Sequence, residues 1–399
     1  MFVQLTILVL AGLAGPMLAF GRRGLIPVVI GELVAGFVLG HTGFGVINSA
    51  TQPLPVLSGI GFAMLMFSAG THVDIASPAI RSGFARGVLA LVAVAVTAVP
   101  LALLLDHALN IGHLWLIAVI VTGSSAAIAF PIIEERHLAG PNIAFLIAWV
   151  ALADSVTVVI MPLTLAKSAN PLPALAGDAA IIAAGVVTLV AARRVRHTRI
   201  VGDMRQESLQ RGWAWQIRIS LVLLLGLSAI AERTGASTLV AGFLAGMILV
   251  RLHESDRLAL QFSGVANGFF VPLFFVLLGA ELNLRALFTS PSRILLAIGL
   301  AVAAVITHVI AARIAGREHF LATGLAASAQ LGMPAAAASL GLTTGLLGPA
   351  EAAALVAGGC LTLIPATIGS LLLARGGVTS GTAQPAPGPG QPGPAASLS

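Results

Sequence analysis

Apolar residues follow one another along this chain in thirteen long blocks, separated by short polar or charged segments. The blocks cover residues 3–20, 25–43, 54–73, 86–106, 112–134, 142–167, 173–193, 214–231, 236–251, 261–280, 291–313, 318–342 and 348–374. An α-helix needs roughly 20 apolar residues to cross the hydrocarbon core of a bilayer. The pattern therefore predicts an all-α polytopic membrane protein with about 13 transmembrane helices.

Composition supports this interpretation, since 58% of the 399 residues are hydrophobic and only 9% are charged. These values exclude a soluble enzyme, and we expect neither an enzymatic activity nor a cofactor. The net charge of +6 does not indicate a nucleic-acid partner, because the basic residues are spread over short loops. The single cysteine, Cys360, cannot form an intramolecular disulfide or a thiolate metal site. The expected surroundings are a lipid bilayer.

The basic residues also predict an orientation. Of the 21 Lys and Arg residues, 17 lie in the loops that follow odd-numbered blocks. Because short cytoplasmic loops are enriched in Lys and Arg, the amino terminus is predicted outside and the carboxyl terminus in the cytoplasm. The first block has its positive charges after the apolar stretch, so we expect a retained helix and not a cleaved signal peptide.

An internal repeat organises the chain. Residues 33–40 and 239–246 are identical at six of eight positions, and the same offset of 206 residues maps blocks three to six onto blocks ten to thirteen. Repeats displaced by seven spans run through the membrane in opposite directions, as in many secondary transporters. We expect repeat one at about 25–167 and repeat two at about 231–374. An Arg-rich cytoplasmic connector, residues 194–212, lies between them within a transmembrane domain of residues 1–375.

Polar interruptions fall at corresponding places in the fifth and twelfth blocks. The fifth carries residues 122–125, Thr-Gly-Ser-Ser, followed by Pro131, and the twelfth carries residues 328–334, which include Gln330. Pro and Gly weaken a helix and free carbonyl groups, so these blocks are predicted to be crossed discontinuous helices. Ordinary Gly and Ser packing is the alternative for either block alone. The candidate ion ligands are Thr122, Ser124, Ser125 and Gln330.

Asp154 lies halfway along the sixth block, where a carboxylate costs about 2.5–3.5 kcal/mol to insert. Such residues usually serve ion or proton pathways, so Asp154 is the candidate site for a proton or a monovalent cation. Thr157 lies on the same helix face, where its hydroxyl can bond either the carboxylate or its own helix. Glu32 is expected near a span end beside Arg22 or Arg23, which leaves Asp154 as the only deep acid.

Three motifs carry a family resemblance. They are residues 27–32 with Gly36 and Gly40, residues 65–70 followed by Asp74, and residues 272–279. Over roughly residues 5–375 the chain resembles the bacterial monovalent cation:proton antiporters of the cation:proton antiporter-2 superfamily, which includes the Kef-type potassium systems. The resemblance implies exchange of protons for Na⁺ or K⁺ by alternating access in the bacterial inner (cell) membrane, with a homodimer as a candidate assembly.

The resemblance also assigns roles to residues. In that family the helix matching the sixth block carries an acidic pair, or an Asn or Gln followed by Asp, and the second residue binds cation and proton. Here the pair is Ala153-Asp154, so the binding position is kept and its partner is lost. Electrogenic members carry a lysine in the helix matching the eleventh block, and the counterpart here is His308. A packing role for His308 is the alternative, and we expect electroneutral exchange.

The last residues, 376–399, are rich in Gly and Pro and are expected to be a disordered tail. Residues 388–393 match the sequence pattern of a dinucleotide-binding loop. The match does not predict such a site, because no strand precedes these residues. No soluble nucleotide-binding domain fits in this tail. The alternative function is therefore a Kef-type potassium efflux channel-like protein without a soluble regulatory domain. A membrane aspartyl protease would need two facing carboxylates.

Overall fold

The computed structural model describes residues 2–20, 28–40, 43–49, 51–71, 78–126, 129, 133, 138, 140–165, 172–195, 198–234, 238–252, 262, 264–316 and 318–375. Arg22, Arg23, Asp74, Pro131 and the tail 376–399 lie outside these residues, so the expectations that concern them stay predictions.

Helices make up almost all of the described chain, as the apolar blocks predicted. In chain order they are α1 (Phe2–Gly12), α2 (Ala14–Ala19), α3 (Val28–Leu39), α4 (Leu54–Thr71), α5 (Pro78–Leu109), α6 (Leu114–Thr122), α8 (Pro141–Thr164), α9 (Leu172–Val195), α10 (Arg199–Arg211), α11 (Trp215–Thr234), α12 (Thr238–Arg251), the π-helix η1 (Ala266–Phe270), α14 (Val271–Glu281), α15 (Leu284–Thr289), α16 (Pro291–Ala315), α17 (Phe320–Ala327), α18 (Gly332–Thr344) and α19 (Pro349–Arg375).

The membrane-spanning character is confirmed. Within the described residues, eight helical stretches are long and apolar enough to cross a bilayer, and three shorter helices are also apolar. Each predicted apolar block overlaps one or two of the helices. The count of thirteen spans stays a prediction.

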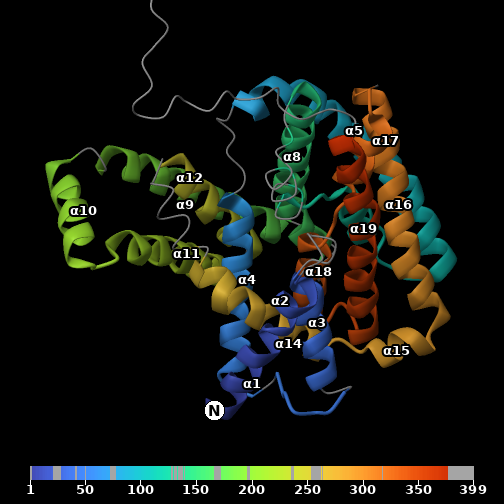
Figure 1. Ribbon diagram of the computed structural model, residues 1–399, viewed down its shortest axis with the longest axis horizontal. Coiled ribbons are helices and arrows are strands. Elements are labelled where there is room, and N and C mark those ends of the chain that lie inside the picture. The colour runs from blue at the N-terminus through green and yellow to red at the C-terminus, as the bar shows by residue number, and fades with distance from the viewer. Residues whose placement is uncertain are drawn as a thin grey trace, which may run out of the picture.

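The helices divide into two bundles that lie side by side (Figure 1). The first, which we call the Asp154 bundle, contains α5, α6, α8 and α16–α19, and its helices pack mainly on one another. The second, the α4 bundle, contains α1–α4, α9, α11, α12, η1 and α14. At the boundary between the bundles, α8 and α18 of the Asp154 bundle lie opposite α3, α4 and α14 of the α4 bundle.

Close packing in the α4 bundle follows the internal repeat. Helix α3 packs on α14, and α12 packs on α4, so the equivalent helices of the two halves have exchanged partners. Gly36 of α3 lies directly against the Val276 carbonyl, and Gly246 of α12 lies against the Phe67 carbonyl. Small residues at such crossings let two backbones approach closely. Gly36 is the fourth residue of its octapeptide and Gly246 the eighth of the other, so both octapeptides make close glycine contacts, at different positions.

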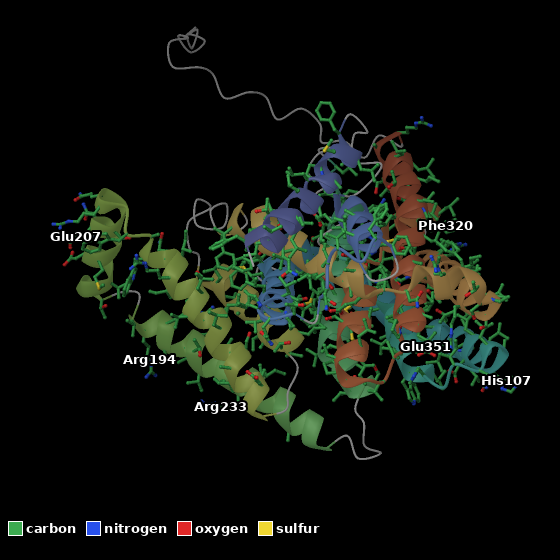
Figure 2. All side chains as sticks on the ribbon, turned by 90° about the horizontal axis from the view of Figure 1, so that it is seen from below. His107, Arg194, Glu207, Arg233, Phe320 and Glu351 are labelled. Atoms are coloured by element: carbon green, nitrogen blue, oxygen red, sulfur yellow. The ribbon has the colours of Figure 1, made fainter. Side chains whose placement is uncertain are left out.

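Residues 199–211 of the connector 194–212 form the helix α10. This helix packs on α11 at the edge of the molecule, far from the Asp154 bundle (Figure 1). Glu207 and Arg211 form an exposed ion pair along it at 3.0 Å. In the second view, Glu207 and Arg194 lie at one end of the molecule, and Phe320 and Glu351 at the other (Figure 2).

Candidate ion-binding site

Two helices break at the positions that the polar interruptions predicted. Helix α6 ends at Thr122, and Gly123 to Ser125 are not helical. Helix α17 ends at Ala327, and helix α18 begins at Gly332. Carbonyl and amide groups at such breaks lose their partners within the helix and must find others, because an unpaired polar backbone group is costly in a membrane.

Two side chains at the breaks supply those partners. The Ser124 hydroxyl donates to the Ala327 carbonyl over 2.6 Å. The Gln330 amide donates from Nε2 to the Val121 carbonyl at 3.1 Å and to the Gly123 carbonyl at 2.9 Å. Both residues are buried. Their side chains join one broken helix to the other, and the prediction that they are cation ligands stays a prediction.

Asp154 lies beside the first break. It comes from the middle of α8, is 5% exposed, and its Oδ2 accepts a hydrogen bond from the Ala126 amide at 3.2 Å. Ala126 directly follows the non-helical Ser125, so its amide is one of the groups that the break sets free. A free amide at the start of a helical turn favours a nearby negative charge. The break therefore supplies a backbone hydrogen-bond donor to the Asp154 carboxylate.

A cavity of about 220 Å³ contains the Asp154 side chain. On the Asp154 bundle its walls also include Ser125, Val158 and residues 331–333. On the α4 bundle they include Ser68 of α4 and Asn267 of η1, together with apolar side chains such as Val29 and Phe275. Asp154 thus lies at the boundary between the two bundles.

Ser68 and Asn267 were not among the residues predicted for this site. A signal for Asn267 was present, since it is an amide inside an apolar block, and the structure places it in a π-helix of five residues. Single π-helical turns are frequent at functional sites. Ser68 also lies inside an apolar block, within the motif of residues 65–70, but its contact with the cavity depends on how α4 packs.

Two predicted hydroxyl ligands, Thr157 and Thr122, are not among the residues that line the cavity. Thr157 Oγ1 donates to the Ala153 carbonyl at 2.7 Å and to the Asp154 carbonyl at 3.3 Å, so it bonds its own helix and not the carboxylate. Thr122 Oγ1 likewise donates to the Ala118 carbonyl at 2.8 Å. Of the predicted polar residues, Asp154 and Ser125 line the cavity.

His308 is fully buried within the Asp154 bundle but does not line the cavity. Its Nδ1 lies 2.8 Å from the Ala304 carbonyl of its own helix, and its ring stacks on Trp149 of α8 with centroids 5.3 Å apart. Its Nε2 is buried without a hydrogen-bond partner among the described residues, so the packing and functional interpretations of His308 both stay predictions.

Glu32 is a second carboxylate that is buried within the protein, whereas the expectation that Asp154 is the only acid deep in the bilayer stays a prediction. It is 2% exposed and lies against Gly15 of α2. Its Oε2 has no hydrogen-bond partner in the described part of the chain. The expected pairing with Arg22 or Arg23 falls outside the described residues.

Within the described residues, no group of three or more His, Cys, Asp or Glu side chains is placed to hold a metal ion. The polar side chains among the residues that line the Asp154 cavity are those of Asp154, Ser125, Ser68 and Asn267. Oxygen ligands of this kind suit hard cations.

Comparisons with known proteins agree with this architecture. The family described as "Sodium/hydrogen exchanger, transmembrane" matches residues 5–374. The Bacillus subtilis (strain 168) protein YjbQ, named as an Na(+)/H(+) antiporter, is 25% identical over 356 residues, covering 85% of this chain but 57% of that protein. The chain therefore spans less than two thirds of that relative.

Two proteins of Methanocaldococcus jannaschii match over a larger share of their own length. One, named Na(+)/H(+) antiporter 3, is 26% identical over 362 residues, which are 86% of this chain and 88% of that protein. The solved structure of the sodium proton antiporter MjNhaP1 superposes with a TM-score of 0.66 at 19% identity. It covers 94% of this chain and 96% of its own, so the two share a fold.

Proposed function

The chain belongs to the family of transmembrane sodium/hydrogen exchangers, and we propose that it exchanges protons for a monovalent cation, Na⁺ or K⁺, with Asp154 as the shared binding group. Membership of this family confirms the resemblance that the sequence motifs suggested. The family is one of transporters. The observation that supports the exchange mechanism most strongly is the Asp154 carboxylate, buried in a cavity between two bundles.

Competition for one carboxylate is sufficient to couple the two fluxes. A proton or a monovalent cation neutralises Asp154, and the neutral site can pass through an apolar barrier at low cost. The empty site keeps its charge, and a buried unpaired charge is strongly disfavoured. Only loaded sites then change sides, so a proton moving one way is exchanged for a cation moving the other way.

The proposed cation ligands come from both bundles. The Asp154 carboxylate and the Ser125 hydroxyl lie on the Asp154 bundle, and Ser68 and Asn267 lie across the cavity on the α4 bundle. Displacement of one bundle against the other would open the cavity to one side of the membrane and close it to the other. Sites at the crossing of broken helices work in this way in inverted-repeat transporters.

We place the protein in a bacterial cell membrane as a multi-pass protein, with the amino terminus outside and α10 in the cytoplasm. The distribution of Arg residues between alternate loops supports this orientation. A homodimer is the proposed assembly.

The test is exchange in everted vesicles or proteoliposomes, read with a pH-sensitive dye after addition of Na⁺, K⁺ or Li⁺. Asp154→Asn should abolish exchange while the protein still inserts and folds, because the amide matches the carboxyl in size but cannot bind and release a proton. Ser155→Ala is the matched control, since Ser155 is the next residue of α8 and its hydroxyl bonds its own helix at Ala151.

Near-normal exchange by correctly inserted Asp154→Asn protein would exclude Asp154 as the shared group. Cation flux that continues without any proton gradient would favour the channel-like alternative over exchange.

A further inference from the structure

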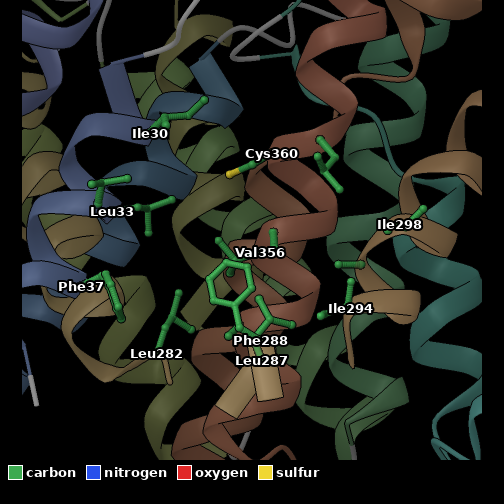
Figure 3. Close-up of a pocket in the computed structure, with 15 residues that line it drawn as sticks. Ile30, Leu33, Phe37, Leu282, Leu287, Phe288, Ile294, Ile298, Val356 and Cys360 are labelled. Atoms are coloured by element: carbon green, nitrogen blue, oxygen red, sulfur yellow. The ribbon is translucent and has the colours of Figure 1, made fainter. Parts of the chain in front are cut away.

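A second cavity, of about 380 Å³, lies between the two bundles and shares no lining residue with the Asp154 cavity. Helix α3 supplies one wall, with Ile30, Leu33 and Phe37 (Figure 3). Helices α16 and α19 supply the other, with Ile298 and Val356 among their side chains. The short helix α15 closes one end. We call this cavity the α3–α19 groove.

The α3–α19 groove has a buried floor and an exposed rim. Leu33 and Val356 on the floor are 7% and 3% exposed, whereas Phe288 and Ile298 on the rim are 71% and 47% exposed. The groove is therefore open along one side. Helices α16 and α19 are long and apolar enough to span the membrane, and α3 is a shorter apolar helix. The open side then faces the hydrocarbon of the bilayer and not water.

The chemistry of the lining points to one class of ligand. The side chains that face the groove are apolar except for the thiol of Cys360. Sites for polar ligands normally carry a few polar groups that fix the orientation of the ligand, and none is present among these lining residues. The volume of the groove falls within the range of about 300–1,000 Å³ that is typical of ligand pockets. What fits is a flexible apolar chain.

We propose that the α3–α19 groove binds one acyl chain of a membrane phospholipid. Lipid tails are the apolar chains that surround these helices. A groove left empty in hydrocarbon loses the dispersion contacts of its floor, and in lipid such packing contacts replace the hydrophobic effect as the driving force. Because its walls belong to both bundles, a bound chain would also resist their relative displacement. This last consequence rests on the proposed exchange mechanism, whereas the binding does not.

The test uses a phospholipid with a diazirine on one acyl chain, reconstituted with the full-length protein and activated by light in the absence of any ion gradient. Bulk lipid can label rim residues and exposed positions such as Ile364 of α19, which is 63% exposed. Only a chain inside the groove can label the floor. We expect mass spectrometry to find adducts on Leu33 and Val356.

Matched variants check the assignment. Ala357→Phe places a ring in the groove from α19 and should reduce the floor adducts several-fold, and Cys360→Phe should do the same. Ile364→Phe, on the same helix but outside the groove, should leave them unchanged. Adducts confined to exposed residues, or floor adducts that persist in both folded filling variants, would overturn the proposal. Since no transport is measured, this outcome is independent of whether Asp154 exchanges ions.

Discussion

Ser124 and Ala327, which are 203 residues apart in the chain, are joined by a hydrogen bond of 2.6 Å from the Ser124 hydroxyl to the Ala327 carbonyl. The bond connects the break after α6 to the end of α17, and the Gln330 amide makes the reverse connection to Gly123. The two discontinuous helices thus satisfy each other's free carbonyls. Ser125, the next residue after Ser124, lines the Asp154 cavity.

Removing the Gln330 connection should destabilise the protein. Gln330→Leu leaves the Val121 and Gly123 carbonyls without that donor, and each unsatisfied buried group costs about 1–3 kcal/mol. We expect a clear loss of thermal stability, measured as the fraction that stays monodisperse in detergent after heating. Thr343→Val is the control, because Thr343 is exposed on α18 and bonds its own helix. Equal melting of the two variants would show that the amide does not join the breaks.

Adjacent serines should behave differently when mutated. Ser125→Ala removes a hydroxyl from the cavity and should raise the apparent KM for the cation with little change in thermal stability. Ser124→Ala removes the donor to Ala327 and should mainly lower stability. The measurement is the cation dependence of exchange together with heating in detergent. The opposite assignment of effects would mean that Ser124 and not Ser125 is the ligand.

Glycines of the octapeptide repeat should tolerate no side chain. A Cβ at Gly36 would overlap the Val276 carbonyl oxygen, and one at Gly246 would overlap the Phe67 carbonyl oxygen. Alanine at either position must push two backbones apart, so expression and thermal stability should fall. Gly226→Ala on α11 is the control, because its Cβ meets no atom within 4 Å and alanine favours a helix. Normal stability of Gly36→Ala would contradict the close packing of α3 on α14.

Exchange should be electroneutral, with one proton for each cation. Asp154 follows Ala153, which cannot titrate, and the buried His308 bonds its own helix and stacks on Trp149. Na⁺-driven exchange in proteoliposomes should therefore be insensitive to a membrane potential set with valinomycin and a potassium gradient. A steep dependence of the rate on potential would indicate a second titrating group. His308→Gln would then show whether that group is His308.

The side of the membrane on which α10 lies can be tested by labelling. Gln210 is exposed on α10, so Gln210→Cys in a Cys360→Ala background gives one reactive thiol. We expect an impermeant maleimide to label it in everted vesicles but not in intact cells. Labelling of intact cells at the rate of a known external cysteine would reverse the proposed orientation.

Hydropathy and spacing alone predicted the spanning helices, the two breaks and Asp154. Each of these features depends on residue type within one segment: a long apolar block must be helical in lipid, a Gly and Ser interruption weakens it, and a lone carboxylate within such a block is costly.

Only the tertiary structure decided which polar groups reach the cavity. Ser124 and Ser125 are neighbours of the same type, yet one bonds α17 and the other lines the cavity, because the crossing of the breaks sets which hydroxyl meets a carbonyl. Ser68 and Asn267 enter the site from a different bundle. The position of Ser68 and Asn267 at the cavity, like the burial of Glu32 against α2, depends on how helices distant in the sequence pack together. A local pattern of residues does not predict that packing.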